Sequence, residues 1–499
     1  MKRQNTIDQF SSETYDLLII GGGITGAGVA LDAASRGLKV ALVEKGDFAS
    51  GTSSKSTKLI HGGLRYLKQF EISLVREVGQ ERALIHKLAP HLVIPEKMLL
   101  PLIKNGTFGK WATTIGLFTY DLLAGVSGKD KFRMLDKKET MDLEPLLPEK
   151  KILGAGLYAE YRTDDARLTI EVMKTAGRYG ALPLNYVLAE KLNYVEGQVA
   201  GATCKDVLTG EQFEIKAKFV VNATGPWSDE LRKQDGSLTD KRMFLTKGVH
   251  LVFPWVKLPI NHAIYFDVPD GRMIFAIPRQ GIVYVGTTDT PYKGDLDDIQ
   301  ANQEDISYLL DAVNNMFPSI QLIAEDMLTS WAGVRPLIYE AGKSASEISR
   351  KDELFESESG LMTIAGGKLT GYRVMAEKIT DLVCKRMWKV YQQNYKKCIT
   401  EEIPLTENPF ESYQAVLDYE EKLGQALTEK GLTAKDATYL VQNYGRQSDQ
   451  ILSLMKGNGS KSMLEAEKAF TTAYEWVEKP DDFWERRTGR RLFQAQVKS

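Results

Sequence analysis

The chain has 499 residues, of which 43% are hydrophobic and 26% charged, and its formal net charge is −2 at pH 7. At about 150 residues per domain, this length predicts about three domains. The near-neutral balance argues against nucleic acid as the main partner, because no basic excess exists to neutralise phosphates.

The sequence also limits where the protein can work. Its three cysteines are far apart, which argues against a disulfide framework and a clustered metal site, so no metal is predicted. Residues 1–14 are polar and predict neither a signal peptide nor a membrane anchor. No later run approaches the about 20 apolar residues that span a bilayer. We therefore expect a cytoplasmic protein that meets a membrane only from its surface.

The first predicted elements form a dinucleotide-binding unit. A buried strand is expected over residues 15–20, and it ends in a glycine-rich turn. In that turn Gly21, Gly23 and Gly26 form the G-x-G-x-x-G pattern, which lets backbone approach a pyrophosphate and a helix pack close to the strand. A helix and a second strand follow, and Glu44 then stands where a ribose hydroxyl needs an acceptor. This context favours adenine dinucleotide binding over a glycine turn without a ligand.

The loop over residues 47–67 combines small hydroxyl side chains with apolar residues at near-helical spacing. A polar loop that enters the interior must find partners for its hydrogen-bonding groups, and a cofactor rich in oxygen atoms supplies them. The residues of this loop that we expect to contact the cofactor are Thr52, Ser53, Ser54, Lys58, Leu59, His61 and Gly62.

The next predicted elements are an amphipathic helix over residues 71–92 and a strand over 97–102. Large apolar side chains then gather in the segment 107–126. That segment is either a core helix or a surface that meets lipid or quinone, because it is too short to span a bilayer. The sequence leaves both interpretations open.

The middle of the chain returns to the first sheet and then predicts a second one. A short apolar strand at 219–225 ends in a glycine turn at Gly225, as expected of a return to the parallel sheet. Short alternating strands follow and suit an antiparallel sheet over a site, at 243–253, 262–266, 273–278 and 282–286. Residues 360–372 repeat the pattern of strand, double glycine and helix.

The last part of the chain is charged and helical, with helices expected at 413–430, 434–444 and 463–477. Near its end, aromatic residues flank an arginine cluster made of Arg486, Arg487, Arg490 and Arg491. We expect this cluster to lie on a solvated helix face, and contact with anionic lipid headgroups is the alternative.

A family resemblance rests on seven motifs spread over residues 19–373. In chain order they are IIGGGITGAG, TSSKSTKLIHGGLRYL, DDARL, VNATGPW, GTTD, WAGVRPL and GGKLTGYR. Together they resemble the FAD-dependent glycerol-3-phosphate dehydrogenases of aerobic respiration. The second motif discriminates most, because simple dinucleotide folds lack it.

The resemblance implies a flavoprotein that holds FAD noncovalently, oxidises sn-glycerol 3-phosphate to dihydroxyacetone phosphate and passes electrons to membrane quinone. It also implies peripheral attachment to the cytoplasmic face of the membrane, and we expect a homo-oligomer. The chain has neither the long N-terminal extension nor the calcium-binding loop of mitochondrial members, so it is similar to the bacterial, calcium-independent type.

The expected fold class is α/β, an α+β two-domain flavoprotein with an added helical domain. It has a discontinuous Rossmann-like FAD domain, a cap domain with an antiparallel sheet for the substrate, and a C-terminal helical domain. The boundaries that we expect are 1–75, 150–230 and 331–388 for the FAD domain, 76–149 and 231–330 for the cap domain, and 389–499 for the helical domain.

A phosphorylated polyol needs cations that hold a dianion in fixed geometry. The residues expected to do this are Arg65, Arg335, Lys368 and Arg272. Oxidation also requires loss of the substrate hydroxyl proton, so a base near neutral pKa is useful. The predicted base is His250, against the alternative of an ordinary strand histidine. Tyr66 and Lys368 are expected to orient or polarise the hydroxyl instead.

The reduced flavin carries negative charge, which the N-terminus of a helix stabilises. The segment that has this form, and that we assign to the flavin ring, contains Gly366, Gly367, Lys368, Leu369 and Thr370. The adenosine ribose is assigned to Glu44 and the pyrophosphate to the opening glycines.

Three alternatives remain open at this point. A glycerol-3-phosphate oxidase of the same family would pass electrons to oxygen. An amine or amino-acid oxidase of the wider flavoprotein superfamily would take a different substrate, which the basic residues disfavour. A membrane-associated scaffold would have kept the fold and lost the cofactor.

Overall fold

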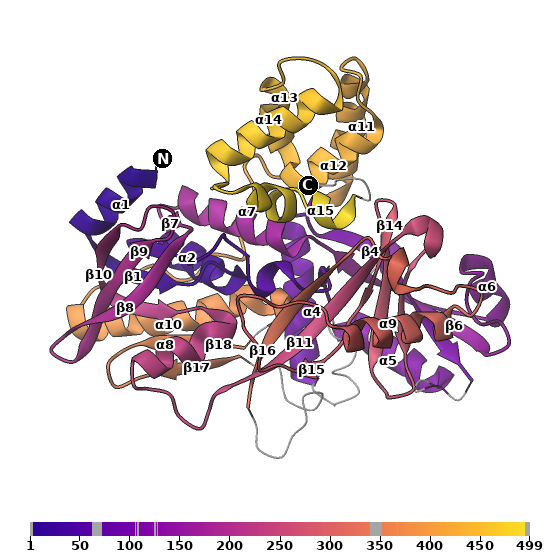
Figure 1. Cartoon of the computed structure of the whole chain (residues 1–499), viewed down its shortest axis with the longest axis horizontal. Coiled ribbons are helices and arrows are strands. Elements are labelled where there is room, and N and C mark those ends of the chain that lie inside the picture. Colours follow the sequence, from indigo (N-terminus) through magenta and orange to yellow (C-terminus); the bar gives the residue numbers. More distant parts are fainter. Residues whose placement is uncertain are drawn as a thin grey trace.

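The computed structural model describes residues 3–61, 72–104, 106, 109–123, 126, 128–339, 352–366 and 368–494. Figure 1 shows two sheets side by side, with helices packed around them and a group of C-terminal helices above them. Within the described residues, no helix combines the length and the apolar character that crossing a membrane requires.

The first sheet is mainly parallel at its centre. Its strands are β1 (Thr14–Ile20), β2 (Val40–Val43), β7 (Leu182–Leu184), β8 (Val187–Val195), β9 (Gln198–Asp206), β10 (Gln212–Asn222), β17 (Glu353–Glu356) and β18 (Met362–Ala365). They follow the order β17-β18-β10-β1-β2-β7, and β9 pairs with both β8 and β10. Because β1 pairs in parallel with β10 and with β2, the carboxyl ends of these strands meet at one edge.

Alternating side chains of β1 build two different cores. Leu17 and Ile19 pack on one face of the sheet, in a cluster with helices α2 (Ile24–Arg36), α7 (Asp165–Arg178) and α10 (Tyr372–Tyr391). Leu18 and Ile20 face the other way, into a cluster with β8 to β10 and helix α1 (Arg3–Ser12). A central strand that is covered on both faces reads as a continuous apolar run, which is why the sequence predicted it.

The second sheet is mainly antiparallel. Its strands are β3 (Leu59–Ile60), β4 (Ile94–Ile103), β5 (Arg133–Leu135), β6 (Ile152–Arg162), β11 (Met243–Pro254), β12 (Ala263–Asp267), β13 (Met273–Arg279), β14 (Ile282–Gly286), β15 (Thr290–Pro291) and β16 (Thr329–Ile338). They follow the order β15-β11-β14-β13-β12-β4-β6-β3, with β16 beside β11 and β5 beside β6. In β11, Val249 and Leu251 face helix α9 (Gln303–Met316), whereas Val252 packs on the opposite face.

The remaining helices are α4 (Ile72–Leu88), α5 (Lys110–Leu123), α6 (Lys137–Leu143), α8 (Ser228–Gln234), α11 (Tyr413–Thr428), α12 (Ala434–Tyr444), α13 (Ser448–Ser453), α14 (Gly459–Tyr474) and α15 (Arg490–Phe493). Helices α11 to α14 share a hydrophobic core of their own. Figure 1 shows this helical group on the opposite side of the molecule from α5.

The predicted fold class is confirmed, and most predicted strands and helices lie within a few residues of the observed ones. The domain boundaries stay a prediction. Three strands differ from the expected division: β3, β6 and most of β16 were placed with the FAD domain, yet all three pair with strands of the second sheet.

Two surface expectations need correction. The arginine cluster does not form a solvated face, because Arg487 is 0% exposed and Arg486 only 9%. Segment 107–126 is not a plain core helix either, since Trp111 on α5 is 84% exposed. The arginines are buried because Asp47, 439 residues away from Arg486 in the sequence, pairs with them.

Candidate active site

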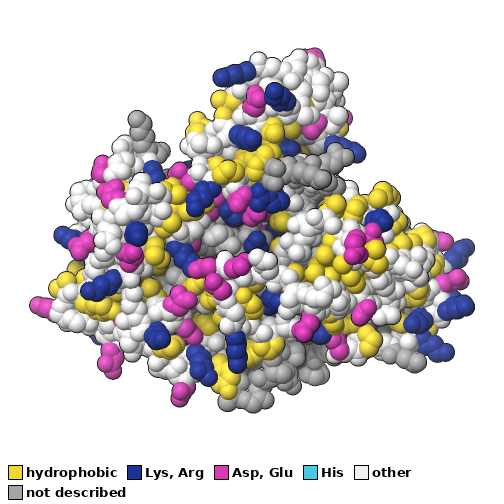
Figure 2. All heavy atoms as spheres, viewed as in Figure 1, with side chains coloured by type: hydrophobic (Ala, Val, Ile, Leu, Met, Phe, Trp, Pro, Cys, Tyr) yellow, Lys and Arg dark blue, Asp and Glu magenta, His cyan; other side chains and the backbone are white. Residues whose placement is uncertain are grey.

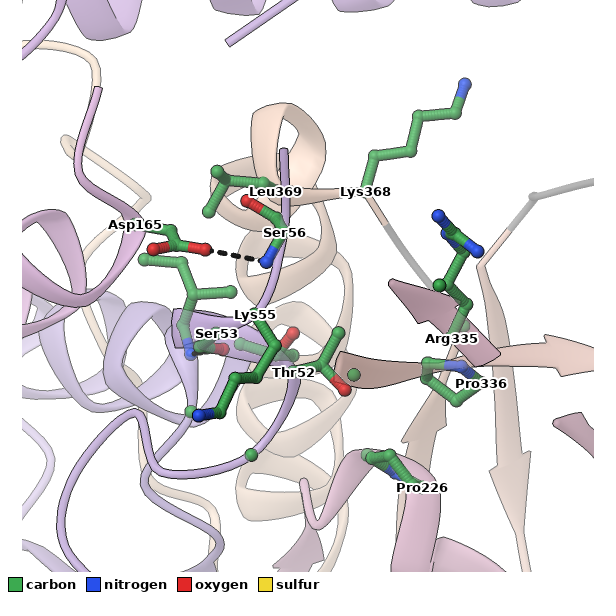
Figure 3. Close-up of a pocket in the computed structure, with 18 of the residues that line it drawn as sticks. Thr52, Ser53, Lys55, Ser56, Asp165, Pro226, Arg335, Pro336, Lys368 and Leu369 are labelled. Atoms are coloured by element: carbon green, nitrogen blue, oxygen red, sulfur yellow. Dashed lines mark hydrogen bonds between the residues drawn. The ribbon is translucent and has the colours of Figure 1, made fainter. Parts of the chain in front are cut away.

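A cavity of about 980 Å³ lies between the two sheets. The carboxyl ends of β1 and β2 line one end of it, and β13 and β16 of the second sheet line the other. Figure 3 shows the central part, where the loop around Thr52 faces Lys368 and Arg335. Such a volume is typical of sites that hold a cofactor or a small molecule.

The glycine turn at the end of β1 forms a backbone cradle. Gly21 has φ of 116°, and a Cβ added there would lie 2.5 Å from the Ala223 carbonyl oxygen. A Cβ on Gly26 would collide with the Gly21 carbonyl, so this glycine holds α2 against the strand. Gly23 caps α2 without a side-chain hydrogen bond, and it lines the cavity. Free N–H groups at a helix N-terminus suit a pyrophosphate.

Glu44 lies in the cavity wall directly after β2. Its two carboxylate oxygens accept hydrogen bonds from the Gly22 N–H (2.7 Å) and the Gly46 N–H (2.9 Å). Burial raises the pKa of the Glu44 carboxyl, and these two N–H groups oppose the rise. Each oxygen keeps a second lone pair, so the residue can also accept from ribose hydroxyls. The cradle and Glu44 together fit the adenosine diphosphate part of a dinucleotide.

The hydroxyl-rich loop divides into residues that line the cavity and residues that anchor the loop. Thr52 and Ser53 line it: the Thr52 hydroxyl donates to the Val334 carbonyl (2.6 Å), and Ser53 Oγ accepts from the Ile24 N–H (2.9 Å). Leu59 and His61 line it as well.

Ser54 and Lys58, which were predicted to contact the cofactor, are not among the residues that line the cavity. Lys58 is 1% exposed, and its ammonium donates to Asp165 Oδ1 (2.6 Å) and to the Ser54 carbonyl (3.1 Å). The other carboxylate oxygen of Asp165 accepts from the Ser56 N–H, as the dashed line in Figure 3 marks. This buried ion pair fixes the loop to α7. The Lys58 ammonium, which was predicted to contact the cofactor, is bound to Asp165 instead.

Cationic side chains gather at the other end of the cavity. Arg335, on β16, donates to Thr287 Oγ1 (2.9 Å), to the Thr288 carbonyl (3.2 Å) and to Asp289 Oδ1 (3.3 Å). Figure 3 shows Arg335 and Lys368 extending to the same side. A guanidinium held by three acceptors keeps its fork in one orientation, which suits recognition of an oxyanion.

Arg272 lines the same cavity but is engaged elsewhere. Its guanidinium donates to Asp270 Oδ2 (2.6 Å) and stacks 3.9 Å from the Tyr308 ring centre. Gly225, Gly366, Leu369 and Thr370, which were predicted to contact the cofactor, line the cavity. The Thr370 hydroxyl donates to the His61 carbonyl (3.3 Å), which joins the two predicted cofactor segments.

His250, the predicted base, is not among the residues that line the cavity. It is 1% exposed and stacks on Trp331, with ring centres 4.7 Å apart. Its Nε2 lies 3.0 Å from Thr57 Oγ1, and Thr57 does line the cavity. Burial holds the pKa of His250 well below its usual value, and the charges of Arg335 and Lys58 add to this effect. The ring is therefore neutral at physiological pH.

Four predicted site residues lie outside the described residues: Gly62, Arg65, Tyr66 and Gly367. The cavity wall also contains several residues that were not predicted. Thr57 belongs to the motif TSSKSTKLIHGGLRYL, and Asp289 ends the motif GTTD. Trp227 likewise ends the motif VNATGPW. Tyr158 and Tyr265 belong to none of the motifs, and only the folded chain brings them to this cavity.

A dinucleotide cradle joined to a cationic pocket defines the class of protein as a dinucleotide-dependent oxidoreductase with a Rossmann-like sheet. The chain belongs to the FAD-dependent oxidoreductase family, which matches residues 16–373. The FAD dependence that the motifs implied is thereby confirmed.

Three relatives are similar over nearly the whole chain. An aerobic glycerol-3-phosphate dehydrogenase of Bacillus subtilis (strain 168) is 49% identical over 500 residues, covering 99% of this chain and 90% of the relative. An aerobic glycerol-3-phosphate dehydrogenase of Staphylococcus aureus (strain MRSA252) is 50% identical over 502 residues, again covering 99% of this chain and 90% of the relative. A solved glycerol-3-phosphate dehydrogenase of Bacillus halodurans, complexed with FAD, has a TM-score of 0.83 and 41% identity, covering 99% of this chain and 89% of that one. The resemblance drawn from the motifs is confirmed.

Proposed function

We propose that this chain oxidises sn-glycerol 3-phosphate to dihydroxyacetone phosphate with noncovalently held FAD and passes the electrons to a membrane quinone. The observation that carries the proposal is the single cavity that joins the cradle of Gly21 and Glu44 to the cations Arg335 and Lys368. A dinucleotide and a small phosphorylated substrate can therefore lie end to end. The names of the similar proteins supply the substrate.

The cofactor is held by backbone more than by side chains. The α2 N-terminus and the Gly21 turn bind the pyrophosphate, and Glu44 binds the adenosine ribose. The segment from Gly366 to Thr370 lies at the flavin end, where N–H groups favour negative charge. When bound, FAD accepts a hydride at N5 of its ring.

The substrate phosphate is held by Arg335 and Lys368, and Arg65 from outside the described residues joins them in this proposal. Arg335 is already oriented by Thr287 and Asp289, so little side-chain freedom is lost on binding. A forked donor also fixes the direction of the phosphate, which places the reacting carbon toward the flavin end of the cavity.

The proton of the substrate hydroxyl leaves through Thr57 in this proposal. Thr57 Oγ lies in the cavity wall, 3.0 Å from Nε2 of the neutral His250 ring. When the substrate hydroxyl gives its proton to Thr57 Oγ, the hydroxyl of Thr57 gives its own proton to His250. His250 thus remains the proton acceptor, one hydroxyl group away from the substrate, and its lowered pKa makes it a weaker base than the near-neutral group that the sequence predicted. Thr57→Val is expected to slow oxidation while leaving flavin binding intact.

Peripheral membrane attachment and a homo-oligomeric state belong to the same proposal. A quinone is dissolved in the bilayer, so its reduction requires the flavin cavity to lie near a membrane surface. The relatives are named for an aerobic enzyme, which supports a respiratory electron acceptor. Attachment to the cytoplasmic face fits a substrate that carries a phosphate group.

The experiment compares electron acceptors with the purified flavoprotein. We expect glycerol 3-phosphate to reduce a soluble quinone analogue rapidly, with slow oxygen consumption. Fast peroxide formation without quinone reduction would identify an oxidase instead. Turnover of glycine or sarcosine, but not of glycerol 3-phosphate, would identify an amine oxidase.

A further inference from the structure

Helix α5 carries apolar side chains on two opposite faces. Its inner face packs on β6, where Leu117 and Tyr120 are 0% exposed. Gly156 of β6 permits this close approach, because a Cβ there would lie 2.5 Å from Leu117 Cδ1. The outer face is exposed to 84% at Trp111, 63% at Ile115, 59% at Phe118 and 70% at Leu122. Their spacing of four, three and four residues places them on one side of the helix.

An outer face of this kind needs a partner. Soluble proteins expose single apolar residues freely, but a contiguous row of large ones marks an interaction site. A helix that is apolar all round is normally covered on every side. Tryptophan and phenylalanine beside leucine and isoleucine are the side chains that enter the interface of a lipid leaflet.

The charges around α5 favour an anionic partner. Lys104 before the helix and Lys131 and Arg133 after it are exposed, and Arg133 also contacts Glu139 (3.3 Å). The neighbouring acidic groups are engaged: Asp121 is 7% exposed and accepts from the Phe132 N–H (2.7 Å), and Asp130 pairs with Lys97 (3.4 Å). Figure 2 shows Lys and Arg side chains gathered at the lower right, the end of the molecule where Figure 1 places α5 and α6.

The inner face of α5 connects this surface to the cavity. The Tyr120 hydroxyl donates to Glu160 Oε1 (2.5 Å), and Arg82 of α4 donates to both Tyr120 and Glu160 (3.0 and 2.8 Å). Glu160 lines the cavity. A partner seated on the outer face of α5 therefore lies one layer of side chains and one strand away from the site.

We propose that the outer face of α5 is the surface that docks on an anionic lipid leaflet, with its apolar row at the acyl boundary and the flanking cations at the headgroups. This inference rests on the proposed function, since it names the surface through which quinone is reached. A second copy of the chain fits less well, because a two-fold contact on this face would bring the same cations together.

The test is flotation of the full-length flavoprotein with vesicles of phosphatidylcholine, with and without phosphatidylglycerol. We expect binding to the mixed vesicles that weakens as salt is raised. Ile115→Glu should reduce the vesicle affinity by about tenfold or more, because it removes apolar area and adds a repelled charge. Val195→Glu is the matched control: Val195 is also β-branched and 63% exposed, and it lies on β8. The vesicle affinity of the Val195→Glu variant should stay near that of the unaltered chain.

Oxidation of glycerol 3-phosphate with a soluble dye separates this inference from the proposed function. Ile115→Glu should keep dye-linked activity and flavin absorbance while losing vesicle binding. Equal loss in Ile115→Glu and Val195→Glu, or no vesicle binding by an active unaltered chain, would overturn the docking surface alone. Vesicle binding without dye-linked activity would overturn the function alone. If Ile115→Glu fails to fold, Trp111→Ser repeats the test. If either variant turns a dimer into a monomer, the outer face of α5 is the contact between two copies of the chain, and the lipid-docking proposal is overturned.

Discussion

The arginine cluster at the C-terminal end and helix α5 at the opposite side behave in opposite ways. Arg486 and Arg487, which composition would place in water, are buried against Asp47 with contacts of 2.6 and 2.7 Å. Trp111 and Ile115, which composition would place in a core, face outward. Burial depends on what the fold brings to a segment. Charged side chains can therefore be buried in ion pairs that join two parts of the molecule, and large apolar side chains can be exposed on a surface for a partner.

The largest effect on stability is expected at the buried clamp, by which we mean the ion pairs that Asp47 forms with Arg486 and Arg487. Asp47→Ala leaves two arginines without their buried partner, which typically costs about 3 to 5 kcal/mol of the free energy of unfolding. Since Asp47 follows Glu44 by three residues, flavin should also be lost more easily. Urea unfolding and flavin release measure the two effects.

Glu149→Ala is the control for the clamp. Its exposed pair with Lys137 spans 3.9 Å, and such pairs contribute between about 0 and 1 kcal/mol. If Asp47→Ala were no more destabilising than Glu149→Ala, the clamp would carry no stability.

The next largest effect is expected on substrate binding in the cavity. Arg335→Ala should raise the KM for glycerol 3-phosphate, because a lost charge-assisted contact costs about 1.5 to 3 kcal/mol, or about 10- to 150-fold. Steady-state kinetics with a soluble dye measure the change. Arg133, an exposed arginine that does not line the cavity, is the control, and Arg133→Ala should leave KM unchanged. An unchanged KM in Arg335→Ala would remove Arg335 from the site.

The third effect is a pH dependence at the C-terminal interface. His91 is 0% exposed beside Phe410 and Gly445, and burial lowers its pKa to about 3, with Arg167 and Lys174 adding to the shift. The unfolded chain binds the proton below about pH 6.5 and the folded chain does not, so stability is present above that pH and is lost as pH falls toward 3.

His91→Leu isolates this effect. Between pH 6.5 and 5 the unaltered chain should lose about 2 kcal/mol more than the variant, at about 1.36 kcal/mol per pH unit. Urea unfolding at both pH values measures the difference. Equal losses in the two proteins would show that His91 takes up its proton in the folded state.

The smallest effect is expected on the outer face of α5. Trp111→Ser should change the free energy of unfolding by less than about 0.5 kcal/mol, as exposed substitutions usually do. On the inner face, Tyr120→Phe should cost about 1 to 3 kcal/mol, because Glu160 and Arg82 lose a buried partner. Thermal unfolding of both variants compares the two faces, and a large loss in Trp111→Ser would mean that the outer face is covered within the molecule.

The sequence was sufficient wherever the signal was local. The strand over 15–20 and its glycine turn follow from a short apolar run and a fixed spacing, and the family motifs located Arg335 and Lys368. It was insufficient wherever a partner is distant in the chain. Lys58 appeared to face a cofactor because Asp165, which pairs with it, lies 107 residues further on.

The same limit explains the histidine and the two surfaces. The alternation of β11 places His250 on the face toward Thr57, but the hydroxyl between His250 and the cavity belongs to another segment. The partners of Arg487 and the exposed row on α5 likewise depend on packing between elements. Local spacing predicts which face a residue occupies, and only the fold decides what lies opposite that face.

The most direct test is an anaerobic titration of the purified yellow protein with sn-glycerol 3-phosphate, followed by flavin absorbance. We expect the absorbance to bleach at low substrate concentrations in the unaltered chain and only at much higher concentrations in Arg335→Ala. A flavin that glycerol 3-phosphate leaves oxidised, while glycine or sarcosine bleaches it, would contradict the account.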